Sequence, residues 1–245
     1  MKNQGKNFVE TTKYRYLDES NQNKGLPQPP LVLPMINETH QVFSLPAPQD
    51  LNIAKVDLTD AINNRVSVRK YKDEELSLQE LSYLLWVTQG IKEVVKRPAT
   101  KRTVPSAGCR HAFETYLLIN NVAELPAGLY KYLPLDHTLE LIPTEAGIAD
   151  KITKACLRQS MVSNSAVTFM WVAVKERMYW RYGERGYRYL YIDAGHVCQN
   201  LYLACEAIAS GCCAIAAYFD DELDSLLGIN GDDQFTIYVA TVGKK

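Results

Sequence analysis

The sequence lacks the patterns by which metal-binding and disulfide-rich proteins are recognised. Its six cysteines form no C-x-x-C pair and show no spacing typical of a zinc site. We therefore expect reduced thiols and no bound metal. The cysteines are Cys109, Cys156, Cys198, Cys205, Cys212 and Cys213.

Long apolar runs are also missing. A membrane-spanning helix needs about 18 or more uninterrupted apolar residues. The most apolar region, 197–219, is broken by Gln199, Asn200, Glu206 and Ser210. The N-terminus is polar and lacks the apolar core of a secretory signal. These absences predict a cytoplasmic protein with no membrane partner.

Neither a strong charge nor a dinucleotide motif is present. The 245 residues carry a formal net charge of -1, so we expect no whole-chain attraction to nucleic acid. The sequence contains no G-x-G-x-x-G, which argues against a Rossmann nucleotide site. Any recognition of phosphate must therefore be local.

The chain divides into an arm and one domain. Residues 1–50 contain six of the eleven prolines, which forbid long helices and favour extended backbone. We interpret 1–50 as a Pro-rich N-terminal arm and 51–245 as a single globular domain. Apolar residues such as Leu31 and Phe43 would lie against this domain or another subunit.

Helix signals begin just after the arm. Asp57 or Thr59 is suited to cap a short helix ending near Asn64. Ser77 and Glu80 form a capping box for a second helix, which Gly90 would end in a left-handed conformation. Residues 91–112 are basic and predict a loop.

The rest of the chain alternates irregularly between strand and helix patterns. Strands are expected at 113–119, 128–132, 139–142, 167–174, 214–219 and 235–242. Helices are expected at 148–156, from Asp193 to about Ala209 with Gly211 ending it, and from a cap at Asp220 to Leu227. This order favours an α+β fold over a doubly wound parallel sheet.

Residues 65–71 combine charge and hydroxyl groups in one short stretch. In an extended segment Arg65, Ser67 and Arg69 share one face. Two guanidinium groups around a hydroxyl suit a terminal phosphate, because their forked donors match phosphate oxygens. A solvated basic loop is the alternative.

Four stretches in this order resemble the nitroreductase-like FMN flavoenzymes: residues 65–69, 105–108, 182–201 and 211–220. Residues 181–189, followed by Asp193-Ala194-Gly195-His196, resemble the SagB-type dehydrogenase branch in particular. The resemblance implies a mixed, mainly antiparallel sheet flanked by helices. It also implies a domain-swapped homodimer with FMN bound at the dimer interface.

The resemblance implies an activity. FMN would take hydride from NAD(P)H at flavin N5 and pass it to a small aromatic or heterocyclic acceptor, such as a nitroaromatic or a quinone. Two alternatives remain open: oxidation of azoline heterocycles in a peptide, and a flavin-binding dimer without catalysis. The basic residues at 92, 96, 97, 101 and 102 would form either a solvated loop or a lid that attracts a phosphorylated nicotinamide.

The resemblance also assigns residues to the flavin. Arg65 and Ser67 would meet its phosphate and ribityl oxygens, and Arg69 the pyrimidine edge of the ring, with Val66 counted among the cofactor-binding residues of the same motif. The small-residue loop and the segment along the ring would line it, and a terminal lysine would contact phosphate. These further cofactor-binding residues are Pro105, Ser106, Ala107 and Gly108, then Ile215, Ala216 and Ala217, and finally Lys244.

Two residues are candidates for catalytic polar groups. Azoline-oxidising members of the SagB branch use a Lys-Tyr pair as the base, and Arg181-Tyr182 stands in that place here. An arginine cannot act as a base near neutral pH, because its pKa lies above about 12. Tyr182 and His196 are therefore the expected catalytic side chains, although His196 also suits a structural role.

Overall fold

The computed structural model describes residues 3–96 and 98–245. The helices, including the 3-10 turns marked η, are α1 (Gln4–Thr11), η1 (Tyr14–Tyr16), η2 (Pro48–Asp50), α2 (Leu58–Asn64), α3 (Leu78–Gln89), η3 (Ala107–Cys109), α4 (Ile148–Ala155), α5 (Met161–Asn164), α6 (Lys175–Tyr182), η4 (Gly183–Arg185), α7 (Gly186–Ala207) and α8 (Asp220–Leu226). The strands are β1 (Val42–Ser44), β2 (Ile91–Val95), β3 (Ala99–Arg102), β4 (Phe113–Ile119), β5 (Gly128–Leu133), β6 (Thr138–Ile142), β7 (Val167–Val174), β8 (Ser210–Ile215) and β9 (Gln234–Lys244).

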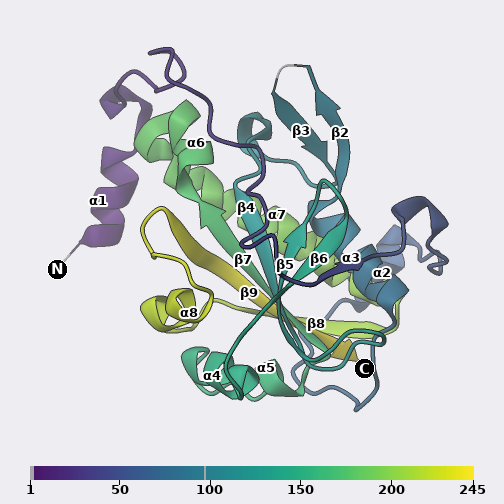
Figure 1. The fold of residues 1–245 in the computed structure, drawn as a ribbon. Coiled ribbons are helices and arrows are strands. Elements are labelled where there is room, and N and C mark those ends of the chain that lie inside the picture. Colours follow the sequence, from purple (N-terminus) through teal and green to yellow (C-terminus); the bar gives the residue numbers. More distant parts are fainter. Residues whose placement is uncertain (1–2, 97) are drawn as a thin grey trace.

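One antiparallel sheet forms the centre of the molecule (Figure 1). Its strand order is β1-β6-β5-β4-β7-β9-β8, and every neighbouring pair of strands runs antiparallel. Strands β2 and β3 form a separate hairpin that projects from the body. The expected α+β fold with a mainly antiparallel sheet is therefore confirmed.

Helices cover both faces of this sheet because its strands are apolar on both sides. In β4, Leu117 and Ile119 join the core under α3 and α7, whereas Tyr116 and Leu118 join the core under α4, α5 and α8. This is the two-residue alternation of a strand, with each face buried by its own helix layer. Helix α7 crosses one face and contributes the largest share of that layer.

The expected helix starts at Asp57 and Ser77 are confirmed by their caps. The Asp57 carboxylate accepts the Thr59 N–H at 2.8 Å. The Glu80 N–H donates to Ser77 Oγ at 3.2 Å, and the Ser77 N–H donates to Glu80 Oε2 at 2.8 Å. Each cap satisfies backbone donors that have no partner inside the helix.

Two expectations around the end of α3 were wrong. Gly90 has a φ of -57°, so no left-handed cap forms there. A Cβ on Gly90 would lie 2.3 Å from the Trp86 ring, so the glycine allows a close approach. Residues 91–95 and 99–102 pair as the β2–β3 hairpin, where a loop was expected. The side chains of β2 are mostly exposed, and two of the buried residues of β3, Thr100 and Arg102, are polar, so no apolar periodicity marked the hairpin.

The bounds of the later helices also differ from expectation. Helix α7 begins at Gly186 instead of Asp193, because η4 leads directly into it and Gly186 lies close against Met178. It ends at Ala207, and Gly211 lies inside β8 rather than terminating the helix. In α8, Asp220 is the first helical residue and Phe219 occupies the cap position. Among the described residues, no helix combines the length and apolarity required to cross a membrane.

Candidate functional site

Residues 65–71 pack on the backbone of two paired glycines in the sheet. Gly211 of β8 pairs with Gly243 of β9. A Cβ on Gly211 would lie 2.4 Å from Val68, and one on Gly243 would lie 2.7 Å from the Tyr71 ring. The Val68 N–H donates to Cys212 O at 2.9 Å, and the Tyr71 hydroxyl lies 2.7 Å from Thr241 Oγ1. The backbone of this segment is therefore fixed against the sheet.

Arg65 and Ser67 meet at Tyr202 of α7. The Ser67 and Tyr202 hydroxyls lie 3.0 Å apart, and the Arg65 guanidinium lies 5.3 Å from the centre of the Tyr202 ring. The Tyr202 hydroxyl also accepts the Ala214 N–H at 2.9 Å. Tyr202 thus connects the arginine segment to β8. Sequence reasoning missed it, because it reads as one more residue of an apolar helix.

In the described part of the chain, neither arginine of this segment is paired with a carboxylate, so both guanidinium charges can act on a bound anion. Among residues 3–96 and 98–245, no carboxylate forms an ion pair with Arg65 or Arg69. Arg69 and Val66 are exposed, and Arg69 acts electrostatically on Cys213, whose thiol pKa is nevertheless raised by burial. Free cations around a fixed hydroxyl form a donor set for an anion.

We call residues 65–69, with Arg65, Ser67 and Arg69, the clamp. The segment 215–217 leaves the sheet beside the clamp. Ile215 is buried at the end of β8, whereas Ala216 and Ala217 are exposed. Ala216 borders a hollow of about 480 Å³ that is also lined by Gly195 and Tyr238. The small side chains leave the backbone open to a flat ligand.

The loop from Pro105 to Gly108 is tied to the other end of α7. The Ser106 hydroxyl donates to Asp193 Oδ2 at 2.6 Å, and the Ala107 N–H donates to the same carboxylate at 3.3 Å. Burial raises the pKa of Asp193, and these two hydrogen bonds oppose the rise. The sequence marked Asp193 as a helix start and as part of the branch-specific stretch 193–196, but assigned it no role at the site.

Tyr182 lies directly over this loop. Gly108 has a φ of +59°, and a Cβ there would lie 2.5 Å from the Tyr182 hydroxyl and 2.8 Å from the Arg181 side chain. The Arg181 Nε–H donates to the Tyr182 hydroxyl at 3.2 Å. Glycine is therefore required at 108 by both backbone and space.

His196 is one helical turn from Asp193 on the same side of α7. Its Nδ1 lies 4.0 Å from Asp193 Oδ1, and 44% of the side chain is exposed. It lies near the loop but makes no short contact with Tyr182 in the described structure. The structure thus brings Pro105–Gly108, Tyr182 and His196 into one neighbourhood around Asp193.

Within the described residues, Lys244 has a carboxylate partner, unlike Arg65 and Arg69. Its ammonium forms an ion pair with Glu80 and donates to Ile208 O at 3.1 Å. Glu80 is also the carboxylate of the α3 capping box. A phosphate contact by Lys244 would therefore compete with Glu80.

The basic residues of the β2–β3 hairpin do not form one surface. Lys101 pairs with Glu93 at 2.7 Å. Arg102 is buried and donates to Gln89 Oε1 at 2.7 Å, and its desolvation lowers its pKa to about 10. Lys92 and Lys96 are exposed, and Arg97 lies outside the described residues.

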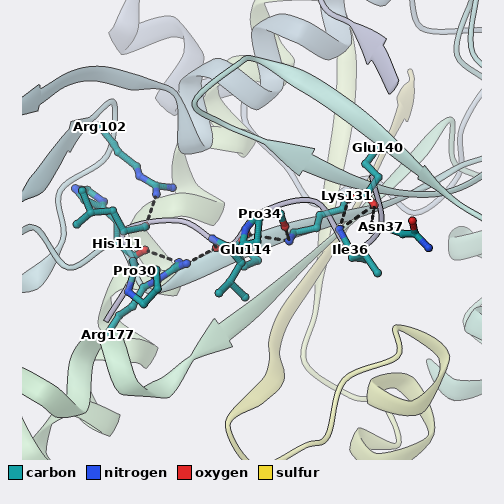
Figure 2. Close-up of polar contacts among 12 residues, drawn as sticks. Pro30, Pro34, Ile36, Asn37, Arg102, His111, Glu114, Lys131, Glu140 and Arg177 are labelled. Atoms are coloured by element: carbon teal, nitrogen blue, oxygen red, sulfur yellow. Dashed lines mark hydrogen bonds and ion pairs between the residues drawn. The ribbon is translucent and has the colours of Figure 1, made fainter. Parts of the chain in front are cut away.

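Part of the arm is bound across the sheet by buried charged side chains (Figure 2). Backbone atoms of residues 30–37, which we call the strap, are their partners. Glu114 Oε1 accepts the Leu33 N–H at 3.1 Å and pairs with Arg177 at 2.6 Å. Other strap contacts run from Arg177 to Pro30 O, from Arg102 to Leu31 O, from Lys131 to Pro34 O, and from the backbone N–H groups of Ile36 and Asn37 to Glu140.

This network explains why so many charges are buried in strands. Each carboxylate or cation faces an opposite charge or a strap backbone group, which offsets its desolvation. His111 shares the region, and burial together with nearby Arg102 lowers its pKa to about 3. The strap therefore holds residues 30–37 against the domain.

Comparison with known proteins gives a consistent result. The family model described as "Nitroreductase family" matches residues 62–244. MJ1384 of Methanocaldococcus jannaschii, a nitroreductase-type protein, is 31% identical over 194 residues, which cover 79% of this chain and 94% of that protein. The trifolitoxin-processing protein TfxB of Rhizobium leguminosarum bv. trifolii is 30% identical over 142 residues, which cover 55% of this chain but only 38% of TfxB.

Solved structures share the fold. A nitroreductase-type protein of Anabaena variabilis aligns with a TM-score of 0.68 and 27% identity, covering 84% of this chain and 42% of that chain. The Escherichia coli microcin synthetase McbBCD complex, with truncated pro-MccB17 bound, contains a chain that aligns with a TM-score of 0.61 and 18% identity. That alignment covers 98% of this chain and 91% of the other, so the likeness of fold includes the arm.

Proposed function

Since the chain belongs to the nitroreductase family, we propose that it is an FMN-dependent oxidoreductase that passes hydride from NAD(P)H to an organic acceptor. The observation that carries this proposal is the clamp at 65–69. There, Arg65 and Arg69 form no ion pair within the described structure, and Ser67 is fixed by Tyr202. The acceptor would be a small aromatic or heterocyclic compound, such as a nitroaromatic or a quinone.

The clamp fits the chemistry of FMN. Arg65 and Ser67 would hold phosphate and ribityl oxygens, because a fork of guanidinium donors and a hydroxyl match them. Arg69, which is exposed, would face the pyrimidine edge of the ring. A cation at that edge stabilises the negative charge that develops there on reduction. Bound FMN would supply hydride acceptance and donation at N5.

Segment 215–217 would lie along the ring. Its exposed alanines allow close approach, and the end of β8 is fixed through the Ala214 N–H bond to Tyr202. The same tyrosine therefore positions both the clamp and this segment. Lys244 would reach phosphate only by giving up its contact with Glu80.

We propose that two copies of the chain complete each site. Asp193 and Tyr202 are nine residues apart, which is about 2.5 turns and about 13 Å along a helix, so they face opposite sides of α7. The Pro105–Gly108 loop is bound at one of them and the clamp at the other. This separation supports a homodimer in which the loop of one subunit meets the clamp of its partner.

Tyr182 and His196 would act on the acceptor side. Tyr182 presents a hydroxyl above the loop at Gly108, and His196 presents a partly exposed ring beside Asp193. Both would orient the acceptor or supply a proton, and hydride transfer itself would depend on stacking and distance. Neither residue belongs to the clamp, so changing either should spare FMN binding.

A test separates this function from flavin storage. The purified protein is mixed anaerobically with NADPH or NADH in a stopped-flow instrument, and absorbance of the flavin is followed. A flavoenzyme bleaches and recovers its colour with a nitroaromatic or a quinone. A storage protein keeps its colour with both nicotinamides, and that result would reject the proposal.

The second candidate is oxidation of an azoline in a peptide, as in the SagB-type branch. Its support is the similarity to TfxB, which is named for processing trifolitoxin, and the position of Tyr182 beside Arg181. Arg181 cannot serve as the base, so Tyr182 would have to act without a lysine. This candidate predicts turnover of a thiazoline peptide with oxygen and without NAD(P)H.

We further propose that residues 1–50 form an arm appended to the domain at 51–245. The family match begins at residue 62 and leaves the arm outside it. The strap attaches the arm to the domain through Glu114, Lys131 and Glu140. A limited proteolysis experiment would detect cleavage between 1 and 50 before cleavage of the domain.

A further inference from the structure

The arm reaches the candidate active site through one glutamine. The Gln22 N–H donates to Trp180 O at 2.8 Å, and the Trp180 Nε1–H donates back to Leu26 O at 2.9 Å. The Gln22 side chain then accepts the Arg181 Nη1–H at 3.1 Å. Gln22 is thus a neutral acceptor for a guanidinium that also donates to Tyr182.

This arrangement fixes Arg181 without neutralising it. Within the part of the chain that the structure describes, no carboxylate forms an ion pair with Arg181. Its guanidinium carbon lies 5.5 Å from the centre of the Tyr182 ring, and its Nε would lie 2.8 Å from a Cβ on Gly108. A positive charge is therefore held at the loop expected to line the flavin.

The arm itself is firmly placed at this point. Tyr14 and Tyr189 have their hydroxyls 3.0 Å apart, and Arg185 donates to Thr12 O at 2.9 Å. Because α1 has no basic residue in its last turn, Arg185 supplies the positive charge that favours a helix C-terminus. Gln22 lies between these contacts and the strap, so both of its flanks are anchored.

We propose that Gln22, which lies outside the family domain, is a positioning residue that holds an uncompensated Arg181 beside Tyr182 and so selects acceptors bearing an anionic oxygen group. This inference rests on the proposed function, because it names the class of acceptor for the same site. A carboxylate in place of Gln22 would pair with the guanidinium and cancel its charge. A neutral amide oxygen orients it and leaves the charge for the substrate.

The test uses the full-length protein loaded with FMN and two matched variants. Gln22→Met keeps the length of the side chain and removes the acceptor. Gln28→Met is the control, since Gln28 is also in the arm but donates to Pro98 O at 2.7 Å, away from Arg181. The probes are 4-nitrobenzoate and its uncharged methyl ester. Their dissociation constants are measured by calorimetry on the oxidised protein, and their rates of flavin reoxidation by stopped flow.

We expect the wild-type protein and Gln28→Met to prefer 4-nitrobenzoate over the ester. In Gln22→Met the ratio of the two dissociation constants should fall about fivefold, because the charge-assisted contact to Arg181 is no longer oriented. A purely structural role would weaken the binding of both probes equally.

An equal loss of affinity for both probes, an unchanged preference in Gln22→Met, or no preference in the wild-type protein would each overturn the inference. Failure of the flavin to bleach with nicotinamide would instead reject the proposed function, because the binding comparison needs no turnover.

Discussion

Val68 packs directly on Gly211, where a Cβ on the glycine would lie 2.4 Å from the Cβ of Val68. This contact sets the height of the clamp above β8. Because the Val68 N–H also bonds Cys212 O, the clamp cannot move away without losing a backbone hydrogen bond. The spacing between Arg65 and the sheet therefore depends on a glycine that is distant in sequence.

Gly211→Ala should lift the clamp from the sheet. We expect a loss of about 1–3 kcal/mol in the free energy of unfolding, as for other overpacked sites, and weaker retention of FMN. Denaturant unfolding and dialysis against buffer measure the two effects. Gly5→Ala is the control, because nothing lies within 4 Å of its added Cβ, and there we expect a gain of roughly 0.5–1 kcal/mol. Full FMN retention by Gly211→Ala would contradict the proposed clamp.

The two arginines of the clamp should have separable effects. Arg65→Ala removes a phosphate donor, so the dissociation constant of FMN should rise about tenfold to a hundredfold. Arg69→Ala should also lower the reduction potential of the flavin, by about 20 mV for a two-electron couple, because a cation near the ring is lost. Fluorimetric titration and a dye-coupled potential measure these quantities. Equal effects of both changes on both quantities would disprove the division of roles.

The buried pair of Glu114 and Arg177 should be costly to break. Glu114→Gln leaves Arg177 buried without a countercharge, so we expect a loss of about 3–5 kcal/mol in the free energy of unfolding. The strap should detach as well, since Leu33 loses a charged acceptor. Urea unfolding and protease sensitivity of the arm measure both effects.

An exposed ion pair supplies the comparison for that experiment. Lys101 and Glu93 are 2.7 Å apart, with 58% and 54% of their side chains exposed. Lys101→Gln should change the free energy of unfolding by less than about 1 kcal/mol. Similar losses for Glu114→Gln and Lys101→Gln would show that burial of the Glu114 network contributes little.

His111 should make the protein sensitive to acid. Its pKa falls from 6.5 to about 3 on folding, through burial and the charge of Arg102. Between these values the unfolded chain binds the proton and the folded chain does not, so stability is full above pH 6.5 and falls on acidification. The slope from this group is about 1.4 kcal/mol per pH unit at most. Urea unfolding of His111→Gln from pH 7 to pH 4 should show a shallower slope than wild type, and an equal slope would contradict the role of His111.

Local patterns predicted most of the fold. The caps at Asp57 and Ser77 use side chains within four residues of their donors, so the sequence alone shows them. The apolar, β-branched and aromatic run at 113–119 likewise predicts a buried strand from neighbouring residues alone, and the strand is buried on both faces. The β2–β3 hairpin escaped prediction because its strands are bound through backbone atoms, and its side chains carry no periodic signal.

The sequence predicted the motifs of the candidate site but not the long-range hydrogen bonds that hold them in place. Arg65, Ser67 and the loop at Pro105 stand out by composition. Tyr202 and Asp193 position them through hydrogen bonds that span 135 and 87 residues. Long-range partners of this kind depend on how α7 packs, which no local pattern encodes.

The most direct measurement is an anaerobic titration of the purified protein with NADPH and with NADH, monitored through the flavin absorbance. We expect a yellow protein that retains FMN, bleaches with at least one nicotinamide, and regains its colour with a nitroaromatic or quinone acceptor. A colourless protein that does not retain added FMN would contradict the central claim, and so would a yellow one that neither nicotinamide bleaches.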